Sequence, residues 1–326
     1  MRKLVLFVAT LAVVAALAVL WAVRGSSPGR GIVFEAKMHG LYQLFTINPD
    51  GSHLRQITHL VVRNSSIPGV EQAAWSPDGK TIIFDSDYER TKEHVISLFT
   101  IGPDGSGLKR VPLYLGQFVG EPAYSPSGKM ISFTWDENGS ALHQQGIEVA
   151  NAAGSDAQRL TWVDHPDAFD QRSNWSPDGE WIAYTEVRGP GQSAILKMRP
   201  DGTGIVELTP WAMAANNAKW SPDGSRIAFN SHNDPQPGED ANLYTMRPDG
   251  TGMVQLTHYA GGKLNAYVGG WSPDGKQIVF HLRGANPDAP GVNQLFILDV
   301  DSGHVRQLTN LPQGANPGYA SWSPAG

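Results

Sequence analysis

The chain has 326 residues, no cysteine and a formal net charge of −6, with 31 acidic and 25 basic side chains. The lack of cysteine excludes disulfides, thiol catalysis and attachment of a lipid to a cysteine of this chain. Four of the basic residues lie within the first 30 positions, so the remainder is more acidic than the total and is expected to repel nucleic acid. The 36 glycines and 23 prolines are typical of an all-β chain with many turns.

The chain opens with two basic residues and an apolar run, Leu4 to Val23. Such a run is long enough to cross a bilayer as a helix, and the basic residues before it stay on the inner side. We therefore expect residues 1–23 to be a signal peptide or signal anchor. The anchor is favoured, because the run continues past its one small-residue cleavage site. Residues 24–30 are expected to be a linker, and the rest is expected to be exported to the periplasm or the extracellular space.

A five-residue motif, an aromatic followed by Ser-Pro-Asp-Gly or a close variant, occurs six times. Its leading aromatics are Trp75, Tyr124, Trp175, Trp220, Trp271 and Trp322. The 45 to 51 residues between successive copies fit the length of a four-stranded propeller blade. Each unit predicts four β-strands. Strand A ends at the motif aromatic, strand B ends at a second aromatic, strand C carries a Leu-Phe-x-Ile pattern, and strand D ends at Leu-Thr.

Two kinds of connection alternate along each unit. Ser-Pro-Asp-Gly joins A to B, and a second Pro-Asp-Gly joins C to D, because Pro presets the first turn position and Gly accepts a left-handed conformation. The spacing across these turns is constant, at 9 and 14 residues, whereas the B-to-C and D-to-A gaps vary from 10 to 17. An antiparallel meander puts the turns on one face and the variable loops on the other. We name these the hairpin face and the loop face, and we predict that ligands bind on the loop face.

The two ends of the repeat region are incomplete in complementary ways. Residues 31–36 have the pattern of a B strand without an A strand, whereas residues 318–322 form an A strand without a B strand. Pairing them completes one blade and removes two open sheet edges. The sequence therefore predicts an all-β fold over residues 31–326. This fold is one six-bladed β-propeller of four-stranded antiparallel blades, closed by the C-terminal strand, with the motif aromatics in the core.

The repeat, WSPDG-x-x-Ile-x-Phe followed by Pro-Asp-Gly and Gln-Leu-Thr, resembles the propeller repeat of the TolB family. Similar repeats occur in prolyl-oligopeptidase-type peptidases and tricorn-like proteins. The resemblance covers residues 31–326 and is specific for fold rather than for function. TolB is a periplasmic protein of the Tol–Pal envelope system with an α/β domain before its propeller. Only 30 residues precede the propeller here, and the chain has no Gly-x-Ser-x-Gly nucleophile elbow, so we expect neither a TolA-contacting domain nor a peptidase.

The loop face carries polar and aromatic candidates for binding. The predicted ligand-binding residues are Asp85, Asp87, Trp135, Asp136, Trp162, His165, Asp167, Arg172, Trp211, His232, Asp234 and His281. Asp85 and His281 belong to a set of six polar residues that directly follow the B-strand aromatics, at one equivalent position around the ring. The pairs Asp85-x-Asp87 and His232-x-Asp234 have side chains that bind metals, but their spacing matches no known metal motif. Solvated loop residues are therefore the simpler interpretation.

Three tryptophans lie outside the repeated positions and on the loop side: Trp135, Trp162 and Trp211. Such rings anchor peptides or stack on sugars, although packing within the loops explains them equally well. The favoured hypothesis is a monomeric, non-enzymatic exported module that presents the loop face to an envelope or extracellular protein or peptide. The third unit, with Trp162 and His165, is the expected anchor. The alternative is a carbohydrate-binding or metal-dependent carbohydrate-active propeller with its site at the channel mouth. No cofactor is expected, apart from a divalent metal under that alternative.

Overall fold

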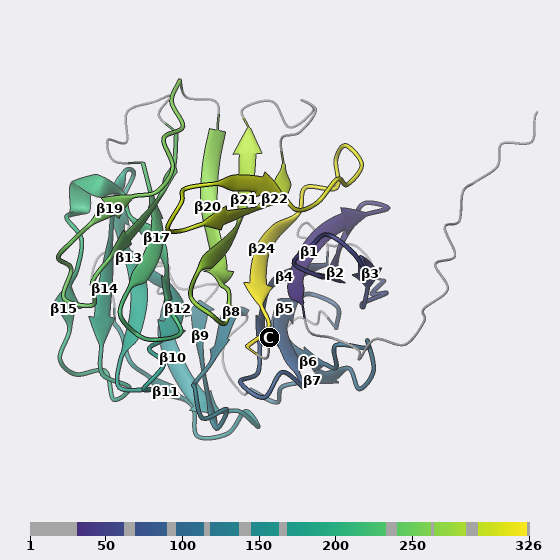
Figure 1. Ribbon diagram of the computed structural model, residues 1–326. Coiled ribbons are helices and arrows are strands. Elements are labelled where there is room, and N and C mark those ends of the chain that lie inside the picture. The colour runs from purple at the N-terminus through teal and green to yellow at the C-terminus, as the bar shows by residue number, and fades with distance from the viewer. Residues whose placement is uncertain are drawn as a thin grey trace, which may run out of the picture.

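The computed structural model describes residues 31–61, 69–89, 96–113, 118–136, 145–162, 168–232, 240–261, 264–284 and 293–324. These residues form six four-stranded antiparallel sheets arranged in a ring, which confirms the predicted six-bladed propeller (Figure 1). Their one helical element is a single 3-10 turn, η1 (Trp211–Met213), and no helix among them has the length and apolarity needed to span a membrane. The predicted signal segment and linker, residues 1–30, lie outside the described residues.

Each blade runs from an inner strand at the channel to a short outer strand. Blade 1 contains β24 (Gly318–Trp322), β1 (Ile32–Met38), β2 (Leu41–Ile47) and β3 (Arg55–Gln56). Blade 2 contains β4 (Val70–Trp75), β5 (Ile82–Ser86), β6 (Ser97–Ile101) and β7 (Lys109–Arg110). Blade 3 contains β8 (Phe118–Tyr124), β9 (Met130–Asp136), β10 (Gln145–Asn151) and β11 (Gln158–Arg159).

The second half of the ring repeats this order. Blade 4 contains β12 (Phe169–Trp175), β13 (Ile182–Gly189), β14 (Gln192–Met198) and β15 (Val206–Glu207). Blade 5 contains β16 (Asn216–Trp220), β17 (Ile227–Ser231), β18 (Asn242–Met246) and β19 (Val254–Gln255). Blade 6 contains β20 (Leu264–Trp271), β21 (Gln277–Gly284), β22 (Gln294–Asp299) and β23 (Val305–Gln307).

The C-terminal strand closes the ring, as the sequence predicts. β24 pairs antiparallel with β1, with Trp322 opposite Ile32 and Gly318 opposite Glu35. In Figure 1 the yellow β24 lies beside the purple β1, although the two strands come from opposite ends of the chain. This pairing covers the edge of β1 that would otherwise present unpaired backbone groups.

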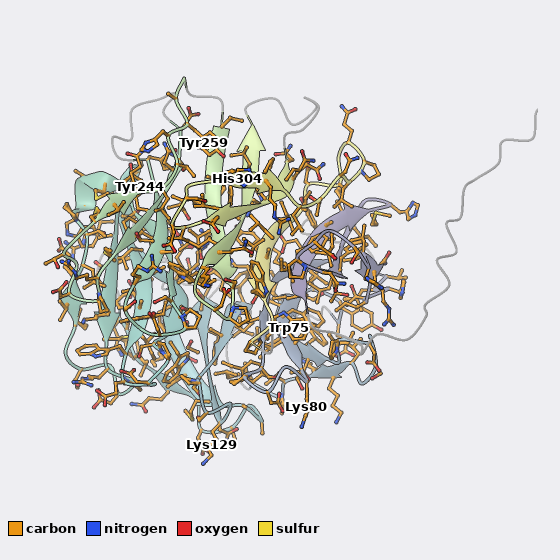
Figure 2. The ribbon with its side chains drawn as sticks, viewed as in Figure 1. Trp75, Lys80, Lys129, Tyr244, Tyr259 and His304 are labelled. Atoms are coloured by element: carbon orange, nitrogen blue, oxygen red, sulfur yellow. The ribbon has the colours of Figure 1, made fainter. Side chains whose placement is uncertain are left out.

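The hairpin turns are held by a repeated set of hydrogen bonds. In the first motif the backbone N–H of Gly79 donates to the carbonyl of Ser76 at 2.9 Å, and the Ser76 hydroxyl donates to Asp78 at 2.7 Å. The Lys80 backbone N–H also donates to Asp78, at 3.0 Å, and the same bonds recur in blades 4, 5 and 6. Lys80 and Lys129, which directly follow two of these turns, lie at the lower edge of the molecule in Figure 2. The hairpin face is therefore a rigid set of near-identical turns.

Apolar side chains pack between neighbouring blades, in six clusters around the ring. In one cluster Val33 and Leu44 of blade 1 pack with Trp75 and Phe84 of blade 2. The motif tryptophans of blades 2, 4, 5 and 6 are buried, which confirms their predicted place in the core. Because every cluster joins two blades, the ring is stable as a whole rather than blade by blade.

Candidate functional site

The inner strands line a central channel with polar side chains. Strand A alternates, so that residues one and three positions before the motif aromatic face the channel. Each inner strand also has a register shift at the second or third position before the aromatic, which is a β-bulge. At four of these bulges a non-glycine residue has a positive φ: Glu121 (55°), Arg172 (58°), Asn217 (60°) and Tyr319 (38°). Bulges redirect side chains, and strained backbone of this kind is concentrated at functional sites.

Arg172 bridges three other blades across the channel. Its Nε lies 3.2 Å from Oε1 of Glu121 in blade 3, and its Nη1 donates to Oδ1 of Asn216 in blade 5 at 3.0 Å. Its Nη2 donates at 3.1 Å to the hydroxyl of Tyr319, which belongs to blade 1. Blade 1 lies opposite blade 4 in a ring of six, so the guanidinium crosses the channel. It divides the channel into a loop-side compartment and a hairpin-side compartment.

Carboxylates from blades 1 to 3 gather in the loop-side compartment. Glu35 follows the B-strand aromatic of blade 1 and is 4% exposed, and Asp85 has the equivalent position in blade 2 and is 1% exposed. Burial, and then the charge of Glu71, raise the pKa of both carboxyls well above its usual value. Within the described part of the chain, Glu35 Oε2 and Asp85 Oδ1 have no hydrogen-bond partner. Glu71 is partly exposed, and burial and then Glu121 raise its pKa too.

Blades 4 to 6 carry the positive and aromatic groups of the channel. Arg283 lies on β21 with its guanidinium carbon 5.8 Å from the centre of the Tyr267 ring. The Tyr267 ring stacks on His281 at 4.8 Å, and burial, followed by the charges of Arg283 and Arg172, holds the pKa of His281 well below its usual value. The imidazole is therefore neutral. Along its described length, the channel is acidic on blades 1 to 3 and basic or neutral on blades 4 to 6.

The hairpin-side compartment is a cavity of about 390 Å³. Its outer rim is formed by the prolines and the aromatic rings of the six motifs, and Arg172, Glu121 and Tyr319 lie at its inner end. Lys219 lies on the inner strand β16 and lines the wall of this cavity. The sequence predicted ligand binding on the loop face and gave no indication of a cavity on the hairpin face.

The structure brings some of the predicted site residues together and separates others. Asp85, His281 and Arg172 all lie among the charged groups of the channel, where Arg172 belongs to the inner strand β12 rather than to a loop. Asp87 is buried and accepts a hydrogen bond from the Gly69 backbone at 3.1 Å. Asp136 and His232 are partly exposed at strand ends, whereas His165, Asp167 and Asp234 lie outside the described residues.

The three unassigned tryptophans have different environments. Trp135 is 2% exposed inside blade 3, with the Arg159 guanidinium 3.5 Å from its ring centre. Trp162 is 63% exposed and meets Trp135 edge-on at 6.4 Å. Trp211 is partly exposed in η1, and Arg188 lies 3.6 Å from its ring centre. Trp162 is therefore the one of the three with most of its surface available to a partner.

Four channel residues were not among the predicted site residues: Glu71, Glu121, Lys219 and Tyr319. Each lies on an inner strand, one to four positions before a motif aromatic. The sequence does contain a signal for them, because other blades carry Ala, Gly, Ser or Asn at several of the positions where these charged or aromatic residues stand. Among the described residues no three His, Asp or Glu side chains are arranged so that they could hold a metal ion.

The fold and the channel define this chain as a six-bladed β-propeller of the TolB type. The crystal structure of TolB from Acinetobacter baumannii matches it with a TM-score of 0.67 and 20% identity, covering 90% of this chain and 66% of that chain. This chain thus spans about two thirds of that TolB. A TolB-type structure from Agrobacterium tumefaciens matches with a TM-score of 0.64 and 22% identity, covering 92% and 95% of the two chains. The resemblance to TolB propellers is confirmed at the level of the fold.

One relative resembles the chain at the level of sequence. An uncharacterized protein of Agrobacterium fabrum (strain C58) is 27% identical over 210 residues, which is 63% of this chain and 67% of that protein. No family model matches the chain.

Proposed function

We propose that this protein is a non-enzymatic exported binding module whose loop face receives an envelope protein or peptide. A cationic group of the partner enters the loop-side mouth of the channel. One observation carries the proposal: two buried carboxyls, Glu35 and Asp85, keep an oxygen without a hydrogen-bond partner in the described chain. A buried polar group without a partner is costly, and retaining two of them side by side in one channel fits a site that is completed by a ligand.

The arginines of the channel do not fully neutralise the carboxyl groups of blades 1 to 3. Arg172 is bound to Glu121, and Arg283 is exposed at the mouth. Glu71 is partly exposed between the two buried carboxyls, and its charge raises the pKa of each. An ammonium or guanidinium group that entered here would meet three carboxyl groups in a setting of low dielectric constant, where such pairs are strong.

Proton release should accompany this binding. The raised pKa values mean that Glu35, Glu71 and Asp85 of the free protein keep their protons to a higher pH than ordinary carboxyls do, into the range above the usual carboxyl pKa. A bound cation favours the ionised carboxylates and displaces those protons, so the affinity should rise with pH across this range. The resemblance to TolB propellers supports an envelope partner. The apolar run of residues 4–23 supports export and attachment to the membrane, and we propose a monomer because six blades close on one chain.

The test uses a tetralysine peptide as a probe and isothermal titration calorimetry in two buffers of different ionisation enthalpy. Wild-type protein should bind the peptide with release of protons, and Glu71→Gln should weaken binding at least about ten-fold, the scale expected for one lost charge pair in a partly buried site. Asp301→Asn is the matched control, because Asp301 is exposed on a hairpin of blade 6. Equal binding by the Glu71 variant, or a failure of the wild type to bind, would contradict the proposal.

A further inference from the structure

The hairpin-side cavity has an unusual charge distribution. Its described lining contains two cations, Arg172 and Lys219, and one carboxylate, Glu121. The remaining lining is proline, aromatic, small or neutral polar. At about 390 Å³, the cavity lies within the size range of small-molecule sites. The cavity is therefore small, has a lining of mixed polar and apolar character, and carries a net positive charge.

Glu121 is fully occupied by other donors. Its Oε1 accepts from Gln72 Nε2 at 2.8 Å and from Arg172 Nε at 3.2 Å. Its Oε2 accepts from the Thr134 hydroxyl at 2.7 Å and from the Arg172 backbone N–H at 2.9 Å. Two oxygens with two acceptor positions each are saturated by these four bonds. Glu121 therefore neutralises Arg172 and has no capacity left for Lys219.

Lys219 breaks the symmetry of the repeat. It directly precedes the motif aromatic Trp220, where the other five blades carry Ala74, Ala123, Asn174, Gly270 and Ser321. These small or neutral residues leave the space that the lysine side chain enters. In the described chain its ammonium group has neither a hydrogen-bond acceptor nor an ion-pair partner, and its partial exposure is to the cavity that it lines. A charge in such a place is costly unless something pairs with it.

We propose that the cavity binds a small carboxylate, with the carboxylate group on Lys219 and the apolar body of the ligand among the proline and aromatic side chains of the rim. Arg172 at the inner end is neutralised by Glu121, so Lys219 is the group that attracts the carboxylate. The site is independent of the cation site on the loop side, because Arg172 separates the two compartments. The C-terminal carboxylate of a peptide has the same chemistry, and the experiment below separates the two sources.

The charge state of Lys219 makes the proposal sensitive to pH. Burial, and then the charge of Arg172, lower the pKa of Lys219 to about 8, while Glu121 acts in the opposite direction. The other titratable groups that line the cavity are Tyr124, whose pKa burial raises to about 12, and Tyr319, whose pKa burial also raises. Neither tyrosine ionises below pH 9. Only the ammonium form of Lys219 attracts an anion, so binding should weaken as the pH rises through the pKa of Lys219.

The experiment titrates the protein with sodium butyrate and follows tryptophan fluorescence, because the rings of Trp75, Trp175, Trp220, Trp271 and Trp322 line the cavity. At pH 7 the wild type should give a saturable change with butyrate and none with the neutral amide butyramide. At pH 9 butyrate should bind about ten-fold more weakly, since about one lysine in ten is then protonated. A tripeptide with a free C-terminus, compared with its amidated form, tells whether a peptide carboxylate also enters.

Three variants make the result decisive. Lys219→Met should lose butyrate binding at pH 7, whereas Lys276→Met, at an exposed hairpin lysine, should keep it. Lys219→Arg should bind equally at pH 7 and pH 9, because an arginine stays charged at both. Unchanged butyrate binding in Lys219→Met, equal binding of butyramide, or no saturable signal with wild type would each overturn the proposal. If Lys219→Met does not fold, a pH-dependent loss in Lys219→Arg equal to that of the wild type would overturn it instead.

Discussion

Replacing Arg172 by methionine tests the arrangement at the centre of the channel. The substitution removes the positive charge beside Glu121 and the side-chain hydrogen bonds to Asn216 and Tyr319. Both partners of the ion pair are less than one fifth exposed. Removing one partner of a buried pair costs about 3–5 kcal/mol, because it leaves an uncompensated charge. Gln72 and Thr134 still donate to Glu121, so we expect a loss at the lower end, about 3 kcal/mol.

Backbone strain does not contribute to this difference. Arg172 has a φ of 58°, and methionine meets the same restriction there as arginine does. The free energy of unfolding is measured by urea denaturation at pH 7 for wild type, Arg172→Met, Glu121→Gln and the double variant. The double variant should be more stable than the sum of the two single losses predicts, because it leaves no buried charge unpaired. A loss below about 1 kcal/mol in Arg172→Met, or strictly additive losses, would refute the assigned ion pair.

Three further predictions concern stability. Deleting residues 318–326 removes β24 from blade 1 and should abolish soluble expression or the cooperative thermal transition, whereas a truncated protein that melts like the full chain would contradict the closure. Asp85→Asn should make stability less dependent on pH. The raised pKa of Asp85 means that the folded state binds more protons than the unfolded one, so wild-type stability falls as the pH rises from about 4 towards that pKa. Urea denaturation at several pH values shows whether this fall in stability persists in the variant. Lys219→Met should raise stability at pH 7 by on the order of 2 kcal/mol. The wild type should itself gain stability as the pH rises from about 8 towards the pKa of lysine in the unfolded chain, because the unfolded chain then binds more protons than the folded protein. Stability that stays constant between about pH 8 and pH 10 would argue against a buried ammonium group.

The fold could be predicted from the sequence because a propeller repeats its constraints. The motif aromatic and the turn after it recur in every unit, and constant spacings of 9 and 14 residues separate rigid turns from variable loops. The incomplete units at the two ends indicated the closure, because β1 pairs locally with β2 on one edge only, and its other edge is covered by β24 from the far end of the chain. These features depend on local turn chemistry and strand alternation, which a single sequence displays.

The site could be predicted only in part. Asp85 and His281 were found because their position after the B-strand aromatic is polar in every blade. Arg172 was predicted as a residue of the loop face, and Glu121 was not predicted; both lie on inner strands at bulges with positive φ, where the regular alternation of side chains is shifted. Glu71 precedes another such shift and reaches the channel from a position where alternation predicts the interior. The pairing of Arg172 with Tyr319 joins residues 147 positions apart, and no local pattern indicates such a contact.

The most direct test of the proposed function asks which face a partner touches in the producing cell. A photoreactive benzoylphenylalanine replaces Tyr88 or Tyr259 on the loop side, or Lys80 or Lys129 on the hairpin side; in Figure 2, Tyr259 lies at the edge opposite the two lysines. Irradiation should give a protein adduct of discrete mass from Tyr88 or Tyr259 and none from the lysine positions, and Glu71→Gln should reduce the yield. Adducts from Lys80 or Lys129 alone, or loop-side adducts that are indifferent to Glu71, would contradict a cation-binding loop face.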